Sequence, residues 1–314
     1  STAFLMELEG MQEMISDEKL TTSDFTTRTV FIQYIQDLYR FFKISPFKNE
    51  FEDVFGGKLD LYRSDFFHEV IEDEAITRNI AEYLFEKSHF EEALDTFHML
   101  LKDRPDDREL LEKAGYSLQK LGNFRKAVAT YQRIGLSEEM NLWTLKNMGI
   151  CYRKLGDFKS ALEVYDKAAV LQPEDQTIES LIGFCHLKLG DFQTALKHYF
   201  KIEYINPGNQ HILRPIAWCY FALGELKKSD KYFARVFEAT PGYYDFINYG
   251  HVQWALGKKK DAVELYLQSL RDLNFEMEDF QKTMEDDRAI LIQNGIFEKD
   301  IPLMLDYLHY RLAK

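Results

Sequence analysis

The sequence lacks the features of a membrane-spanning, disulfide-rich or nucleic-acid-binding chain. No apolar run approaches the roughly 18 residues that a membrane-spanning helix needs. The 314 residues include only three cysteines and no C-x-x-C pair, so we expect no disulfide framework and a reducing, cytoplasmic location. Basic residues are outnumbered, with 39 Lys and Arg against 52 Asp and Glu and a net charge of −13. Such an acidic chain repels phosphate backbones, so we expect no nucleic-acid partner.

Motifs of catalysis and of metal binding are also missing. The sequence contains no G-x-S-x-G, no H-E-x-x-H, no G-x-x-x-x-G-K-[ST] phosphate loop and no paired Cys and His ligands. An acidic cluster over residues 276–288 lacks the D-x-D-x-D-G pattern of a calcium loop, and we interpret it as a solvated face. We therefore expect no catalytic residue, no metal site and no cofactor.

What the sequence does contain is a repeat of 34 residues. The stretch K-L-G-D-F begins at Lys154 and again at Lys188, and it is followed both times by A-L, an aromatic residue and a proline at matched offsets. The cysteines keep the same period, since Cys151, Cys185 and Cys219 lie 34 residues apart. We expect them in the core, because free cysteine packs like a small apolar residue. A period of this length is typical of helix–turn–helix arrays.

The repeated residue types fall at fixed positions of a unit. A unit that starts at Leu142 has glycine at position 8, aromatic residues at positions 11, 17 and 24, alanine at 20 and 27, and proline at 32. This pattern resembles that of the tetratricopeptide repeat (TPR) family. The resemblance implies an all-α, right-handed solenoid of about six helix–turn–helix repeats with N- and C-terminal capping helices. The six units cover residues 74–107, 108–141, 142–175, 176–209, 210–242 and 243–276.

Local chemistry supports the same architecture. A glycine in the middle of a helix, such as Gly183, costs about 1 kcal/mol relative to alanine, so it indicates close contact with the paired helix. Gly156 and Gly190 can end a first helix in the left-handed conformation. Asp157 and Asp191 follow directly and can cap the second helix. No hairpin can bury its apolar stripe alone, so neighbouring hairpins are expected to stack into one solenoid.

Two flanking regions complete the expected organisation. Residues 1–73 are expected to be an N-terminal helical region. Its parts are an amphipathic segment, a helix, a connector and a lead-in helix, at residues 3–15, 25–43, 47–64 and 65–73. The amphipathic segment leaves three alternatives open: a surface helix of a larger protein, a segment that docks into the solenoid groove, or disorder. Residues 277–314 are expected to form C-terminal capping helices, over 277–293 and 302–312.

The groove that the TPR resemblance implies is the candidate functional site. In TPR domains the first helices of successive hairpins line a concave surface through positions 2, 5, 9, 12 and 13. In units three to six these positions hold all three tryptophans and five cations, without a carboxylate. The candidate groove residues are Trp143, Lys146, Ile150, Arg153, Lys154, Phe184, Lys188, His211, Arg214, Trp218, Phe221, Tyr244, His251 and Trp254. Aromatic and arginine side chains dominate binding hot spots, so we expect a protein or peptide partner with acidic and apolar residues.

The sequence thus predicts a non-enzymatic interaction scaffold, and it leaves alternatives open. One is a regulatory or substrate-recruiting region of a larger multidomain enzyme. Another is a solenoid whose groove is filled by its own segments or by a homo-oligomer partner. A third is a solenoid that binds a small ligand or a nucleic acid along its basic groove. The carboxylate clamp of chaperone-binding TPR domains is not expected, because position 9 holds no asparagine in any unit.

Overall fold

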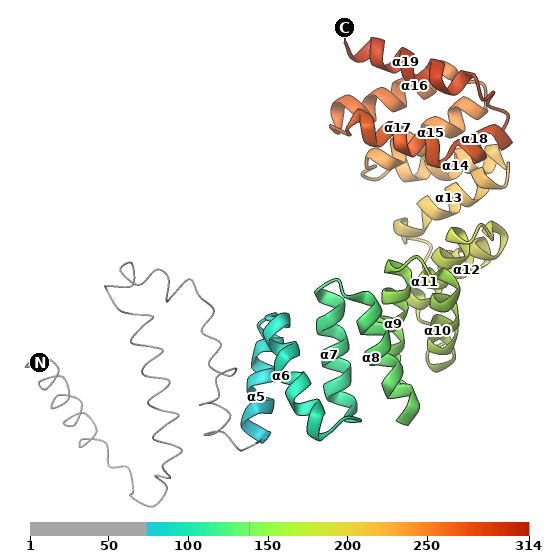
Figure 1. Ribbon diagram of the computed structural model, residues 1–314. Helices are drawn as coiled ribbons and strands as arrows, with labels where there is room; N and C mark the ends of the chain where they lie inside the picture. The colour runs from blue at the N-terminus through green and yellow to red at the C-terminus, as the bar shows by residue number, and fades with distance from the viewer. Residues whose placement is uncertain (1–73, 138, 314) are drawn as a thin grey trace, which may run out of the picture. The chain divides into compact units, whose positions relative to one another are not determined.

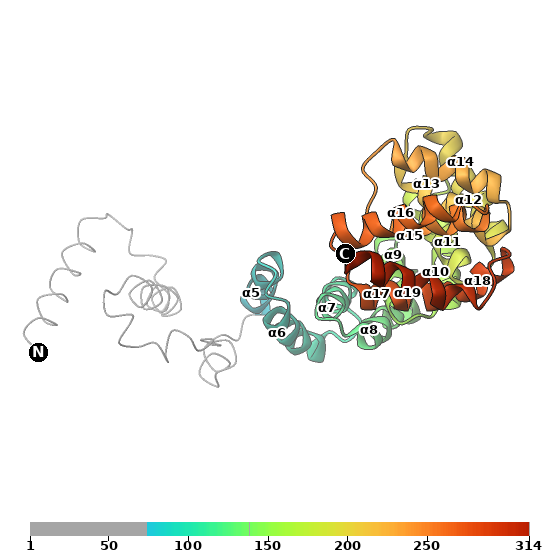
Figure 2. The same cartoon turned by 90° about the horizontal axis from the view of Figure 1, so that it is seen from above.

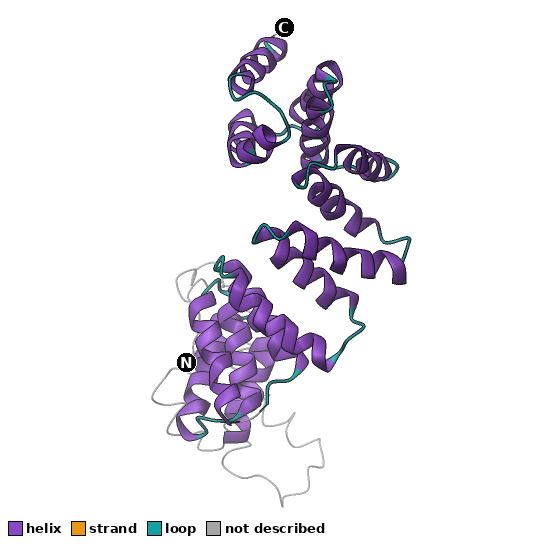
Figure 3. Cartoon of the chain, turned by 90° about the vertical axis from the view of Figure 1, so that its right-hand side faces the viewer, coloured by secondary structure: helices purple, strands orange, loops and turns teal. Residues whose placement is uncertain are grey.

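The computed structural model describes residues 74–137 and 139–313, and in that part of the chain it contains helices and turns but no strand (Figures 1 and 3). The expectations for residues 1–73 concern residues outside this description. The repeats from Ile80 onward belong to one compact unit, Ile80–Lys314. The all-α repeat solenoid expected from the sequence is confirmed.

The helices follow one another as antiparallel pairs joined by tight turns. Their bounds are α5 Glu74–Glu86, α6 Phe90–Asp103, α7 Arg108–Lys120, α8 Phe124–Ser137, α9 Leu142–Lys154, α10 Phe158–Leu171, α11 Gln176–Lys188, α12 Phe192–Ile205, α13 Leu213–Ala222, α14 Leu226–Phe237, α15 Tyr243–Ala255, α16 Lys259–Leu267, α17 Met277–Asp286, α18 Arg288–Gln293 and α19 Asp300–Leu312. A 3₁₀ turn at Gln210–Ile212 precedes α13, and a π turn at Gln268–Asp272 follows α16.

From α6 to α16, consecutive helices pack on one another. The pairs α7–α8, α9–α10, α11–α12, α13–α14 and α15–α16 are in extensive contact, and the second helix of each pair then packs on the following first helix. First helices also touch one another directly, as α7 touches α9 and α11 touches α13. This stacking brings one face of each first helix into a continuous surface, which positions the candidate site.

A glycine faces a tyrosine in the hairpins α7–α8, α9–α10, α11–α12 and α15–α16, and the pair fixes the separation of the two helices. A Cβ atom added to Gly149 would lie 2.3 Å from the ring of Tyr165, and one added to Gly250 would lie 2.3 Å from the ring of Tyr266. Both tyrosines are completely buried. The mid-helix glycine is therefore required because an aromatic ring of the second helix occupies the space of its side chain.

The turns between paired helices follow the expected chemistry. Gly156 and Gly190 adopt φ values of 77° and 80°, in the left-handed region that glycine enters without strain. The next residue in each case caps the second helix, because Asp157 accepts a hydrogen bond from the Ser160 amide and Asp191 accepts one from the Thr194 amide. The three cysteines are fully buried and free, which confirms their predicted place in the core.

The C-terminal helices differ from expectation in one detail. The single helix expected over residues 277–293 is two helices, α17 and α18, which meet at Asp287. Figures 1 and 2 both place α17, α18 and α19 beside α15 and α16. The side chain of Asn294 also donates a hydrogen bond to the Phe221 carbonyl at 3.0 Å, so this region reaches back to α13. Buried Phe280, Met284 and Leu308 seal the end of the core, as a cap must.

Candidate functional site

The candidate residues come from four first helices, α9, α11, α13 and α15. Residues three or four apart on a helix share a face, so positions 2, 5, 9, 12 and 13 of each unit lie on the same side of the first helix. We call the surface that these positions form across successive first helices the groove face. The structure brings only part of the predicted set together on this face.

The α9 end of the groove face begins with an exposed tryptophan. Trp143 is 41% exposed, and its ring centroid lies 5.5 Å from that of Tyr116 on α7 and 6.4 Å from that of Tyr131 on α8. Its neighbour along the face, Ile150, is half-buried. Trp143 thus joins α9 to the preceding hairpin through ring contacts while it keeps a large apolar area open to solvent.

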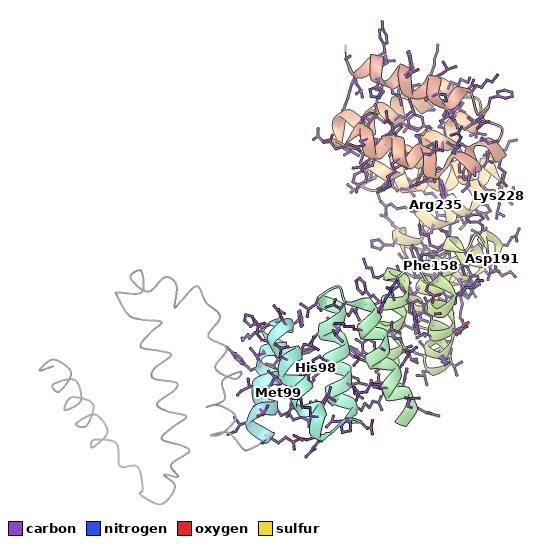
Figure 4. All side chains as sticks on the ribbon, viewed as in Figure 1. His98, Met99, Phe158, Asp191, Lys228 and Arg235 are labelled. Carbon is purple, nitrogen blue, oxygen red and sulfur yellow. The ribbon has the colours of Figure 1, made fainter. Side chains whose placement is uncertain are left out.

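Arg153 and Phe184 form the central contact of the groove face. The guanidinium carbon of Arg153 lies 4.3 Å from the centroid of the Phe184 ring, which is a close cation–π arrangement across α9 and α11. Phe158, labelled in Figure 4, packs against the same ring at 6.1 Å. The Arg153 Nε atom is buried without a hydrogen-bond partner among the described residues. Burial raises the pKa of Tyr165 to about 12, although the nearby Arg153 charge partly opposes that rise.

Two of the five predicted groove cations are held by carboxylates of the solenoid itself. Lys146 donates to Asp175, the residue that caps α11, and Arg214 Nε lies 2.8 Å from both carboxylate oxygens of buried Asp245. Burial tends to raise the pKa of Asp175, but the Lys146 hydrogen bond and two backbone amides outweigh it and hold that pKa below its ordinary value. The expectation of a groove without carboxylates therefore needs correction. Asp175 precedes α11 and Asp245 lies in the first turn of α15, so neither stands at one of the predicted groove positions.

Two lysines of the groove face have no such partner. Lys154 and Lys188 end α9 and α11, are exposed, and form no ion pair with any described residue. The ammonium of Lys188 lies 5.8 Å from the centroid of the Phe184 ring. Lys154 and Lys188 are therefore exposed cations without a counter-charge among the described residues, and Lys188 lies beside the half-buried ring of Phe184.

The α13 and α15 end of the predicted set is mostly closed. Trp218 is half-buried against Phe221, with ring centroids 5.5 Å apart, while His211 and Tyr244 are exposed. Phe221, His251 and Trp254 are buried, with exposed fractions of 0%, 0% and 4%. We therefore remove these three from the groove face.

The reason lies in the C-terminal helices, whose contacts with α13 and α15 cannot be read from the repeat pattern. His251 shows the consequence most clearly. Its Nδ1 lies 2.7 Å from the Tyr266 hydroxyl, and its Nε2 lies 3.4 Å from an Asp287 carboxylate oxygen where α17 meets α18. His251 is therefore an internal contact of the cap.

The structure adds two residues that the sequence-based set omits. Tyr116 and Lys120 on α7 stand at positions 9 and 13, like Phe184 and Lys188 on α11, and Lys120 Nζ lies 5.0 Å from the Tyr116 ring centroid. The predicted groove residues come only from units three to six, where the tryptophans lie. The 34-residue period also predicts Tyr116 and Lys120 as groove residues of unit two. The groove face therefore starts at α7.

A cleft of about 600 Å³ lies elsewhere, between α16 and α19. Ion pairs cross it, since Lys259 contacts Asp300 and Arg311 contacts Glu264. Within residues 74–137 and 139–313, no group of three or more His, Cys, Asp or Glu side chains is arranged to hold a metal ion. No helix in the described part of the chain combines the length and hydrophobicity required to cross a membrane.

Comparison with known proteins places this architecture. Residues 77–286 match the model of a family described as Psidin, N-terminal TPR repeats region. PilF of Pseudomonas aeruginosa is similar in structure, with a TM-score of 0.52 and 14% identity over 68% of this chain and 96% of that one.

A tetratricopeptide repeat protein from Parabacteroides merdae is similar over 69% of this chain and 98% of its own, at 16% identity and a TM-score of 0.47. MamA from Desulfovibrio magneticus is similar over 52% and 93%, at 20% identity and a TM-score of 0.49. Such low identities describe the fold alone. No curated protein matches the sequence.

Proposed function

The chain belongs to the family of the Psidin N-terminal TPR repeats region, and from this premise we propose that it is a non-enzymatic scaffold that binds a protein or peptide partner on its groove face. TPR solenoids are in general interaction scaffolds, and stacked hairpins of this kind offer long surfaces for recognition. The division of the chain into an N-terminal region, six repeats and a C-terminal cap is part of the same proposal.

The observation that carries the proposal is the pairing of open aromatic area with uncompensated positive charge. Trp143 exposes 41% of its surface, and Phe184 lies between the cations Arg153 and Lys188. Aromatic and arginine side chains on a preformed surface are the residue types that contribute most to binding free energy. A rigid helical face also avoids much of the ordering entropy that association costs.

The charge pattern supports an acidic partner. In a chain of net charge −13, many basic side chains are held in internal ion pairs. Arg235 on α14 is one example, because its Nη1 lies 2.7 Å from Glu203 (Figure 4). Lys154 and Lys188 are exceptions on the groove face. Exposed cations of this kind steer an acidic ligand to the surface and set its register.

The alternatives differ in what occupies the groove face. As part of a larger enzyme, the scaffold recruits a substrate or a regulator, and the groove face still binds a separate chain. As a homo-oligomer contact, the groove face is covered by another copy, so the molar mass in solution depends on concentration. Sedimentation of the full chain at several concentrations distinguishes the homo-oligomer from an independent scaffold and from a part of a larger enzyme.

A peptide-display selection tests the proposal without knowledge of the natural partner. The probe is a library of random 16-residue peptides, selected on the full chain. The groove variant is Trp143→Ala with Lys154→Glu and Lys188→Glu. The matched control is Tyr204→Ala with Lys167→Glu and Lys197→Glu, which removes an exposed ring and the same charge from the second helices α10 and α12.

We expect enriched peptides to bind the control variant as they bind the wild type and to lose affinity for the groove variant by more than tenfold. Both variants should keep the wild-type helical circular-dichroism signal, since all substituted side chains are at least partly exposed. Peptides that bind both variants equally, or a selection that enriches none, would contradict the proposal.

A further inference from the structure

Two parallel rows of side chains run along the groove face of α7, α9 and α11. Each of these helices ends on an exposed lysine, and four residues earlier each presents a half-buried apolar side chain. The lysine row is Lys120, Lys154 and Lys188. The apolar row is Tyr116, Ile150 and Phe184. Because residues four apart share a helix face, the two rows lie side by side about one helical turn apart.

Contacts between the helices make the rows continuous. The ring of Trp143 on α9 lies against Tyr116 on α7, with centroids 5.5 Å apart. The guanidinium of Arg153 on α9 lies 4.3 Å from the ring centroid of Phe184 on α11. Side chains of α7 and α9, and of α9 and α11, are therefore in contact, and we call the surface that the two rows form the strip.

The lysine row has no internal counter-charge. None of its three members forms an ion pair with a described residue. Lys113, in contrast, lies on α7 away from this row and pairs with both Glu82 and Glu109. Within a chain of net charge −13, three uncompensated lysines at one position of successive repeats are complementary to carboxylates supplied by a ligand.

The spacing of the row selects a ligand conformation. α7 touches α9, and helices in contact have axes about 8–10 Å apart, so we expect successive lysines of the row to recur at about that interval. A polyproline II chain has three residues per turn and a rise of about 3.1 Å, so every third side chain points the same way at about 9.3 Å. A β-strand repeats a face at about 6.8 Å, and an α-helix repeats one every seven residues at about 10.5 Å. The polyproline II repeat falls within this interval, the α-helical repeat lies just above it, and the β-strand repeat lies below it.

We propose that the strip binds an acidic polyproline II segment whose carboxylates recur at every third residue, one to each lysine of the row. This inference rests on the proposed function and specifies the ligand of that site. The residue beside each carboxylate is apolar and packs against Tyr116, Ile150 or Phe184. The third face of the segment, which points away from the strip, accepts any residue that favours polyproline II, including proline.

Three synthetic peptides test the periodicity directly. The first is a fluorescein-labelled 15-residue repeat of Glu-Leu-Pro, in which the residue before each proline is biased towards the extended conformation. The second has the same composition with its five glutamates at every second residue of its first nine. The third is a helix-forming peptide of the same charge with glutamate at every seventh residue. Fluorescence anisotropy against the full chain gives each Kd.

The matched protein variants are Lys120→Gln, Lys154→Gln and Lys188→Gln together, and Lys167→Gln, Lys197→Gln and Lys231→Gln together. The second set removes the same charge from exposed positions of α10, α12 and α14. We expect the Glu-Leu-Pro repeat to bind the wild type and the second set alike, and to bind the first set on the order of tenfold more weakly. Binding should also weaken as salt is raised, because the contacts lie at the surface.

Several outcomes would overturn the inference. They are equal binding of the two isomeric peptides, tighter binding of the helical peptide, or unchanged binding to the first variant set. Failure here is distinct from failure of the proposed function. If display-selected peptides depend on the groove face but carry no carboxylate at every third residue, the ligand assignment falls and the proposed function stands. If no selected peptide depends on the groove face, both fall.

Discussion

The ring of Tyr165 occupies the space where a side chain on Gly149 would lie. The Cβ atom that glycine lacks would be 2.3 Å from the Cε1 atom of that ring. In the next hairpin the corresponding distance, from Gly183 to the Tyr199 ring, is 3.0 Å. The same pair of positions therefore differs in tolerance from one repeat to the next, and that difference can be measured.

We expect Gly149→Ala to destabilise the protein by about 1–3 kcal/mol, because the buried ring must move. Gly183→Ala should be much closer to neutral. Its methyl group needs a shift of only a few tenths of an ångström, and alanine regains about 1 kcal/mol of helix propensity. Urea titration followed by circular dichroism gives both values. Equal destabilisation by the two substitutions would contradict this interpretation of the contacts.

The buried thiols provide a second prediction. Burial raises the pKa of Cys151 and Cys219 to about 12 and that of Cys185 to about 11. The thiolate is the reactive form, so at pH 8 the native protein should show almost no rapid reaction with a thiol reagent. All three cysteines should react at once in denaturant. Rapid labelling of any cysteine in the native state would show that its helix pair opens or packs differently.

A third prediction concerns Glu179, which is 5% exposed and contacts His198 and Lys201. Burial alone would raise its pKa, but hydrogen bonds from Lys201 and His198 outweigh burial and hold the pKa below its ordinary value. A carboxyl group with a lowered pKa in the folded state stabilises the fold above its unfolded-state pKa of about 4.3. That contribution is lost as the pH falls through the folded-state pKa.

Glu179→Gln should therefore lower the free energy of unfolding at pH 7, and the difference from the wild type should shrink below about pH 4. Glu163→Gln, on an exposed part of α10, controls for the change in net charge. Urea titrations at pH 7, 5 and 3.5 provide the comparison. A constant difference across this range would show that the ionised form of Glu179 does not contribute as described.

The fourth prediction concerns the ion pair between Arg214 and Asp245. Asp245 is 4% exposed, accepts from Arg214 Nε with both oxygens, and also accepts from the Gly242 amide at the start of α15. Removal of either partner leaves the other without compensation, but Arg214 is partly exposed and can recover hydration. We expect Arg214→Ala to cost about 2 kcal/mol or more, because it leaves the buried Asp245 carboxylate without its counter-charge, and Asp245→Ala to cost less. Thermal unfolding of both variants checks the order, and the reverse order would contradict it.

The sequence predicted the repeating parts of the molecule well, because they depend on local chemistry. The left-handed Gly156, the cap at Asp157 and the buried cysteines each follow from one residue and its period. The ring that occupies the space beside Gly149 is less accessible to such reasoning. It requires knowledge of which residue of the second helix faces the glycine, and this emerges only when the hairpin closes.

The candidate site was harder to predict, because two of its properties arise between repeats. Lys146 and Asp175 lie 29 residues apart and meet only after α9 and α11 stack. Trp254 satisfies the positional rule for the groove, yet it is buried. The rule describes an open repeat, whereas the helices after α16 cover this one, and their placement follows no period in the sequence.

The hydrogen bonds from Gln293 and Asn294 to the carbonyls of Ala222 and Phe221 hold the C-terminal helices against α13. The open part of the solenoid therefore ends at a fixed helix. The groove face repeats once per hairpin and ends at a fixed helix, so it has a defined length. On the proposed function, the number of hairpins in this surface would set how many ligand residues it contacts. Duplication of the hairpin α9–α10 would lengthen the groove face by one repeat. A polyproline II ligand would then contact it over three more residues. A hairpin added beyond α19 would leave the length of the groove face unchanged. Internal duplication is therefore the way to vary the length of ligand that is bound while the contacting residue types stay the same.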